Sequence, residues 1–170
     1  IDRQITTNLI KKLLKVVRKG EYPKVHLLHG NLTNTEVGEL YRYPDIKALV
    51  TATRGEGYGL PILEAAASDI PVIATNWSGH LDFLQYGRFI GLDYNLSPIP
   101  NEMVDNQIFM MGSKWAQVIE TDFKKKLKKF RTSSSVPKNW ATELGSVIRE
   151  KFSQSSIEKQ IDSLCREVSP

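Results

Sequence analysis

The sequence is poor in cysteine and lacks long apolar runs. Cys165 is the only cysteine among 170 residues, so an internal disulfide is excluded. A lone thiol favours a reducing compartment, and we expect a cytoplasmic protein with peripheral membrane contact as an option. No apolar run reaches the roughly 18 residues of a membrane-spanning helix, and no signal peptide is visible. His26 and His29 have no ligand set at useful spacing, so we interpret them as structural and expect no metal. No other cofactor is expected either.

The composition is that of an ordinary globular protein. Hydrophobic residues make up 41% and charged residues 25% of the chain. At 170 residues the chain is long enough for one domain with a real core, and we expect residues 1–170 to form a single domain. The net charge of +4 is too small to argue for nucleic acid, so no nucleic-acid partner is expected.

Residues 51–84 are the most informative stretch, TATRGEGYGLPILEAAASDIPVIATNWSGHLDFL. They predict, in order, a strand end, a glycine loop, a helix, a strand, a glycine turn and a helix. Gly57 and Gly59 allow close backbone approach to a ligand, and Pro61 suits the first helical turn. Residues 57–60 should therefore present free N–H groups at a helix N-terminus, which is a ready anion site.

Two carboxylates, Glu56 and Glu64, bracket this loop with seven residues between them. Carboxylates do not bind phosphate, but they accept hydrogen bonds from sugar hydroxyls. Glu64, placed in the first helical turn, can reach a ribose, and Glu56, at the strand end, can reach a second sugar. Taken singly, Glu64 also fits an acid favoured by the helix dipole, and Glu56 a solvated loop acid. Together with the anion site, the pair favours a nucleotide sugar as ligand.

The segment EGYGLPILEA, followed by PVIAT, resembles the donor-binding half of a GT-B glycosyltransferase of the retaining, family-4-like kind. The likeness is strongest over residues 30–84 and weaker from residue 115 onward. It implies the C-terminal half of a GT-B fold, an α/β Rossmann-like parallel sheet with helices on both faces. It also implies an upstream domain that holds a glycan, lipid or protein acceptor, so we expect this chain alone to catalyse no transfer.

The resemblance also assigns roles to residues of the loop. Members of the family carry a Glu-x7-Glu pair (EX7E motif), matched by Glu56 and Glu64. It implies that Glu64 holds the donor ribose, while Glu56 contacts the transferred sugar and stabilises charge in the transition state. Backbone N–H groups for the sugar and diphosphate would come from Gly57, Tyr58, Gly59 and Leu60.

Four further donor contacts follow from the same resemblance. Leu32 would lie against the nucleobase, and Arg3 would match the arginine of a diphosphate clamp. The clamp lysine of the family has no clear match, since Asn8 stands near its place. Where the family often has two glycines and a glutamate, this chain has Gly79 followed by His80. His80 at a helix start either faces the cleft or caps the turn.

The remaining pattern predicts strands that alternate with helices, and hence a parallel sheet with ligands at the carboxyl ends of its strands. Leu32, Glu56 and Gly79 each follow such an end. We expect strands at residues 24–29, 46–50, 71–75 and 89–92. We expect helices at residues 7–18, 34–43, 81–86, 113–132, 140–152 and 156–168, the second opened by a capping box at 33–36. Residues 95–112 are expected to form a long loop, and residues 133–137 a linker.

Two rival functions remain open. Residues 123–131 carry a dense basic run with Phe123, Leu127 and Phe130 on one face. A helix with its lysine face in water is the favoured interpretation, and a non-catalytic module for an anionic membrane or polyanion is the alternative. A sugar phosphorylase shares the architecture, but it needs a lysine for a pyridoxal cofactor, and no such motif stands out. The basic run consists of Lys124, Lys125, Lys126, Lys128, Lys129 and Arg131.

Overall fold

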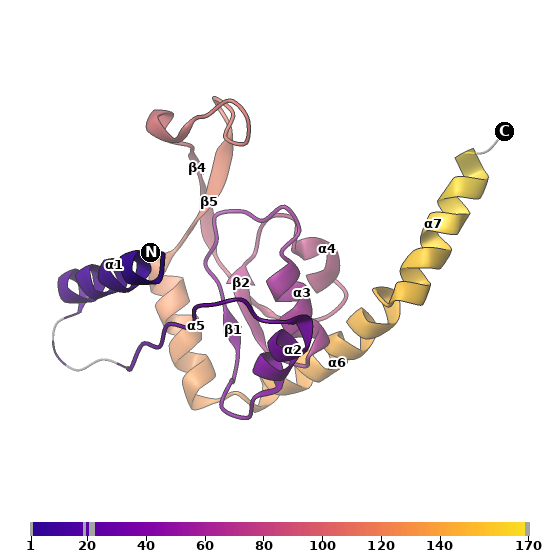
Figure 1. Ribbon diagram of the computed structural model, residues 1–170, viewed down its shortest axis with the longest axis horizontal. Helices are drawn as coiled ribbons and strands as arrows, with labels where there is room; N and C mark the ends of the chain where they lie inside the picture. Colours follow the sequence, from indigo (N-terminus) through magenta and orange to yellow (C-terminus); the bar gives the residue numbers. More distant parts are fainter. Residues whose placement is uncertain (1, 19, 21–22, 169–170) are drawn as a thin grey trace. The chain divides into compact units, whose positions relative to one another are not determined.

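The computed structural model of the chain (Figure 1) describes residues 2–18, 20 and 23–168. The chain divides into two compact units, Ile1–Glu36 and Val37–Pro170, and each is described by itself. Most of the internal contacts belong to the second unit, which also holds all the strands of the described structure.

The first unit contains α1 (Asp2–Val17) and the start of α2 (Asn34–Arg42). α1 begins five residues before the predicted start, and none of its described side chains is buried. The capping box before α2 is confirmed, because the Thr33 N–H donates to Glu36 Oε2 at 2.7 Å. The Glu36 N–H returns a bond to Thr33 Oγ1 at 3.3 Å. The Thr33 amide lowers the pKa of Glu36, as expected for a carboxylate that accepts hydrogen bonds.

The strand predicted at residues 24–29 is wrong. Residues 23–29 adopt no regular secondary structure, and Val25, Leu27 and Leu28 are exposed. An apolar run becomes a strand only where a neighbouring strand accepts and donates backbone hydrogen bonds. Within the described residues no strand pairs with this segment. His26 and His29, interpreted as structural, are exposed as well.

The second unit is built on a parallel sheet in the order β1-β2-β3, which confirms the predicted α/β class. Leu49 pairs with Val72, and Ile73 pairs with Ile90. β1 is shorter than predicted, and β3 lies at a sheet edge. The strands are β1 (Leu49–Val50), β2 (Val72–Thr75) and β3 (Ile90–Leu92).

Helices cover both faces of this sheet, as predicted. Successive residues of a strand point to opposite faces, so Val72 and Ala74 pack in one core cluster and Ile73 in another. The first cluster draws on α3, α4 and α6, and the second on α5 through Phe130 and Phe123. The helices are α3 (Leu60–Ala67), α4 (Leu81–Leu84), α5 (Glu120–Thr132) and α6 (Ser135–Lys151).

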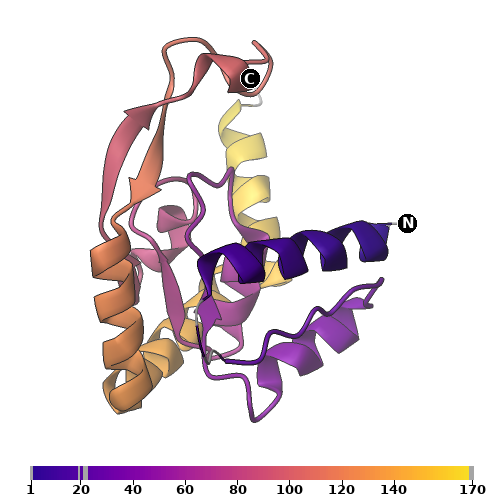
Figure 2. The same ribbon diagram turned by 90° about the vertical axis from the view of Figure 1, so that its left-hand side faces the viewer.

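A β-hairpin replaces the loop predicted at residues 95–112 and the first part of the helix predicted at 113–132. β4 (Tyr94–Pro98) and β5 (Lys114–Val118) pair antiparallel, and α5 starts only at Glu120. Trp115 and Ala116, predicted to be helical, lie in β5. Figures 1 and 2 show the hairpin projecting from the three-stranded sheet, with a short 3-10 helix (Asn101–Met103) near its far end. Pairing between distant segments overrides local helix propensity here.

The C-terminal part is helical as predicted, with α6 followed by α7 (Gln154–Val168). The linker predicted at residues 133–137 is wrong, because α6 already begins at Ser135 and takes Pro137 into its first turn, where its missing N–H costs nothing. No helix among the described residues combines the length and the apolar character needed to cross a membrane.

Candidate functional site

The glycine loop before α3 leaves a row of backbone donors free. Gly59 is the N-cap of α3 with φ of 88°, a left-handed conformation that favours glycine, and Pro61 sits in the first turn. The N–H groups of Ile62 and Leu63 donate to the Gly59 carbonyl. Those of residues 57–60 have no acceptor in the described part of the chain. Four consecutive free donors at a helix N-terminus form the predicted anion-binding geometry.

Ser78 and Gly79 hold this loop by its backbone. The Ser78 hydroxyl accepts the Glu56 N–H at 2.9 Å and donates to the Glu56 carbonyl at 2.8 Å. The Gly79 N–H donates to the same carbonyl at 3.1 Å. A Cβ at Gly79 would lie 2.0 Å from the Gly57 carbonyl oxygen, so only glycine fits there. Gly79, predicted to contact the donor, thus supports the loop with its own N–H already used.

His80 lies behind the loop and does not face a cleft. Its side chain is fully buried, and Nε2 donates to the Thr75 carbonyl at 2.7 Å. Nδ1 has no partner among the described residues, and the ring forms no cap on α4. A Cβ at Gly59 would come within 3.1 Å of His80 Cβ, so the two residues are packed closely. Neither predicted role of His80, ligand contact or turn cap, fits this position.

Glu56 borders a cavity of about 670 Å³. Its backbone is fixed by Ser78 and Gly79, whereas its carboxylate makes no hydrogen bond or ion pair within the described chain. The loop at residues 52–57, with Trp77 and Ser78, forms one wall of the cavity. The hairpin forms the other wall through Ile99, Ile108, Phe109, Ser113, Lys114 and Trp115.

Glu64 lies outside this cavity, on the exposed surface of α3. It falls in the second turn of the helix, not in the first turn as predicted. The Tyr41 hydroxyl donates to the Pro61 carbonyl at 3.1 Å and lies 3.5 Å from Glu64 Oε2. Burial and then the charge of Glu64 raise the pKa of Tyr41. The two carboxylates of the pair therefore have different surroundings.

The Tyr58 side chain anchors the loop. Its ring packs edge-on against Phe83 at a centroid distance of 5.3 Å. Burial, followed by the charges of Asp82 and Tyr86, raises the pKa of Tyr58. The backbone N–H of Tyr58 has no acceptor within the described residues, so it is free to bind a ligand.

Arg3 and Leu32 belong to the unit Ile1–Glu36, so their roles stay predictions. Arg3 is exposed in the first turn of α1, and its carbonyl accepts the Thr7 hydroxyl at 2.7 Å. Leu32 is exposed and follows a segment without a strand.

The basic run on α5 is only partly free. Lys124 pairs with Glu120, and Lys126 pairs with Asp93 and Asp122. Phe123 and Phe130 pack against the sheet, so most of the helix's apolar face is occupied. The remaining cations of the run are exposed and form no ion pair with described residues: Lys125, Lys128, Lys129 and Arg131.

Sequence reasoning missed most of the side chains that line the cavity, among them Arg54, Trp77, Ser78 and Lys114. Arg54 and Ser78 lie near the loop in sequence, but nothing in their types marks them. Trp77 packs close to Gly55, and Lys114 comes from the unpredicted strand β5. Only the placement of the hairpin brings Lys114 to this wall. As for metals, the described side chains contain no group of three or more His, Cys, Asp or Glu placed to hold an ion.

Residues 8–91 match the model of the family described as glycosyl transferases group 1. The chain therefore carries a group 1 glycosyl transferase domain. This confirms the resemblance to a retaining GT-B enzyme, and the matched region includes the glycine loop, Glu56 and Glu64. The match ends within β3, before the hairpin. No curated protein and no solved structure gave a significant match.

Proposed function

We propose that this group 1 glycosyl transferase domain binds the donor of a retaining enzyme, which moves a sugar from a nucleotide sugar to an acceptor. One observation carries the proposal. The N–H groups of residues 57–60 have no protein acceptor in the described structure, and they stand at the N-terminus of α3 within the matched region. Free amides and the helix dipole both favour the donor diphosphate at that position.

In this proposal each of the two carboxylates binds one sugar of the donor. Glu56, with a free carboxylate at the cavity, contacts the transferred sugar, and Glu64, exposed on α3, binds the ribose hydroxyls. Transfer needs the donor held in place and the charge of the departing diphosphate and the oxocarbenium-like sugar stabilised. In this proposal the free amides stabilise the charge of the departing diphosphate without a metal or another cofactor. For Leu32 and Arg3, which belong to the other compact unit, contacts with the base and the diphosphate remain predictions of the family resemblance.

Calorimetric titration with UDP, GDP and ADP tests the proposal. We expect saturable binding of one nucleotide, and we expect Glu64→Ala to weaken it at least about tenfold, since the ribose then loses a charge-assisted hydrogen bond. Glu143→Ala is the matched control, because Glu143 is an exposed helical glutamate on α6. If all three nucleotides fail to bind a folded chain, or if both variants bind equally well, the donor-site assignment is wrong.

A non-catalytic module that binds an anionic surface is the second candidate. The four exposed cations on α5 support it, whereas the packing of Phe123 and Phe130 against the sheet opposes insertion of that helix into a membrane. Lys125→Glu with Lys128→Glu separates the candidates. The module loses binding to anionic vesicles in a sedimentation assay, while the donor-binding domain keeps its nucleotide affinity. A cytoplasmic location belongs to both candidates.

A further inference from the structure

The cavity between the glycine loop and the hairpin has features that donor binding does not use. Its lining stops at Gly57, so the donors of residues 58–60 lie outside it. Glu56, which the proposed function places on the transferred sugar, is the only acid among the lining residues. A ligand in the cavity would therefore lie beside the transferred sugar and would reach only the first of the four loop amides, that of Gly57.

Two cations flank the cavity without an acidic partner. Arg54 and Lys114 both line it, both are exposed, and neither forms an ion pair with any residue that the structure describes. The Arg54 guanidinium lies 4.3 Å from the ring centre of Trp115, which restricts its position. Because Glu56 carries one negative charge, the lining has a net positive charge, which favours an anionic ligand.

The walls also carry aromatic rings at the surface. Trp77 and Phe109 are partly exposed, and both line the cavity. Partly exposed rings pack well on the apolar faces of sugar rings, while Ser113 and Glu56 offer polar atoms to hydroxyl groups. Phe109 is fixed edge-on against Trp115 at 6.0 Å. The wall is therefore an ordered surface with both apolar and polar groups.

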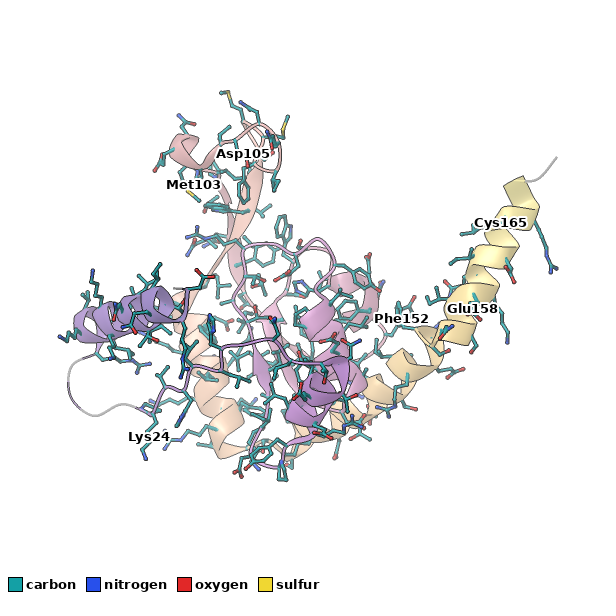
Figure 3. The ribbon with its side chains drawn as sticks, viewed as in Figure 1. Lys24, Met103, Asp105, Phe152, Glu158 and Cys165 are labelled. Atoms are coloured by element: carbon teal, nitrogen blue, oxygen red, sulfur yellow. The ribbon has the colours of Figure 1, made fainter. Side chains whose placement is uncertain are left out.

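One carboxylate orders the hairpin end of this wall. Asp105 Oδ1 accepts the N–H groups of Gln107, Ile108 and Phe109 at 2.8–2.9 Å. These bonds lower the pKa of Asp105. Figure 3 shows Asp105 and Met103 at the far end of the hairpin. Ile108 and Phe109, which line the cavity, are thus held by backbone bonds to a single side chain.

We propose that this cavity is an acceptor subsite, and that it takes a saccharide that bears a negative charge. The inference rests on the proposed function, because the acceptor must approach the sugar that Glu56 contacts. Arg54 and Lys114 bind the carboxylate or sulfate of the saccharide, and Trp77 and Phe109 contact its rings.

The test compares two tetrasaccharides that share N-acetylglucosamine units, hyaluronan tetrasaccharide with carboxylates and neutral chitotetraose. Binding is followed by the indole N–H signals of Trp77 and Trp115 in NMR spectra of the ¹⁵N-labelled chain. We expect hyaluronan tetrasaccharide to shift both signals, and chitotetraose to bind at least about tenfold more weakly. Arg54→Gln and Lys114→Gln should each weaken the charged ligand by about the same factor.

Three outcomes would overturn the inference. Lys125→Gln removes an exposed charge on α5, and equal loss of affinity in that variant would assign the binding to the basic helix and overturn the inference. Equal binding of both tetrasaccharides also overturns it. So does loss of nucleotide affinity in Arg54→Gln and Lys114→Gln, because the cations then serve the diphosphate.

Nucleotide titration of the same samples separates this inference from the proposed function. A chain that binds a nucleotide but neither tetrasaccharide contradicts the subsite alone. A chain that binds hyaluronan tetrasaccharide through Arg54 and Lys114, but no nucleotide, supports an anionic saccharide site and contradicts the donor-binding proposal.

Discussion

The glycine loop and the hairpin line the same cavity, but different contacts hold them in place. The Ser78 hydroxyl and the Gly79 N–H bond to the backbone of Glu56, and the lack of a Cβ at Gly79 lets that residue approach the Gly57 carbonyl. The hairpin is held by backbone pairing between β4 and β5, with Asp105 ordering its far end and Lys126 bonded to Asp93 at its base. One wall of the cavity therefore depends on close packing that only glycine allows, and the other depends on strand pairing.

The largest expected loss of stability comes from a substitution at Gly79, which supports the glycine loop. Gly79→Ala places a methyl group 2.0 Å from the Gly57 carbonyl oxygen, and both contacting groups belong to tightly held backbone. We expect the free energy of unfolding to fall by about 3 kcal/mol, at the upper end of overpacking costs. Urea unfolding followed by circular dichroism measures it.

Gly57→Ala is the matched control, because nothing lies within 4 Å of a Cβ built there. This variant should change the stability by only about 0.5 kcal/mol. Equal losses in the two variants would show that the close approach of Gly79 to Gly57 does not hold the loop.

The next effect concerns the base of the hairpin, where α5 meets Asp93. Asp122 accepts the Asp93 N–H at 2.9 Å and pairs with Lys126 at 2.8 Å, while Lys126 also donates to the Gly91 carbonyl at 2.6 Å. Asp122→Asn should cost about 1–2 kcal/mol, since one charged hydrogen-bond partner is lost. Urea unfolding at pH 7 measures this, and Asp162→Asn on exposed α7 is the control.

The ion pair between Asp122 and Lys126 also predicts that the stability of the protein depends on pH. Burial raises the pKa of Asp122, but the bonds to Lys126 and to the Asp93 amide outweigh it, so the pKa is lowered in the folded protein. A lowered pKa contributes stability that is present above the ordinary pKa of an aspartate and is lost as the pH falls through the folded value. The stability difference between the native chain and Asp122→Asn should therefore shrink in acid. A difference that stays constant to pH 3 would contradict this role.

The smallest effect on global stability is expected at the hairpin end. Asp105→Ala removes the acceptor of three amides, so the N–H groups of residues 107–109 should exchange with solvent roughly tenfold faster. The urea midpoint should hardly move, because this end of the hairpin lies outside the core clusters. Hydrogen exchange detected by mass spectrometry measures it, with Glu102→Ala in the preceding 3-10 helix as control. Unchanged exchange in Asp105→Ala would mean that other contacts order the wall.

The contrast between the two walls also explains what the sequence could predict. Gly59, Pro61 and the following alanines act through local backbone preferences, so the loop and α3 were predicted correctly. The hairpin depends on pairing between residues 94–98 and 114–118, which lie far apart in the chain, and was missed. Residues 24–29 show the reverse error, since an apolar run cannot form a strand without a partner.

Only part of the candidate site was predicted from the sequence, for a similar reason. Glu56 and the free N–H groups lie close together along the chain, and their spacing alone placed them at one end of α3. His80 looked like a ligand contact because its position follows a glycine turn, but burial and the Thr75 carbonyl decide its role. Arg54 and Lys114 acquire a shared cavity only through the hairpin. Side-chain direction and long-range pairing are the physical information that a local pattern lacks.

The most direct test of the central claim is an NMR titration of the ¹⁵N-labelled chain with the nucleotide that calorimetry selects. We expect the largest amide shifts on Gly57, Tyr58, Gly59 and Leu60, whose N–H groups have no acceptor in the described structure. Lys125 and Lys128 on α5 should stay unshifted. Shifts confined to α5, with the four loop amides unchanged, would contradict the claim that the N-terminus of α3 binds the donor.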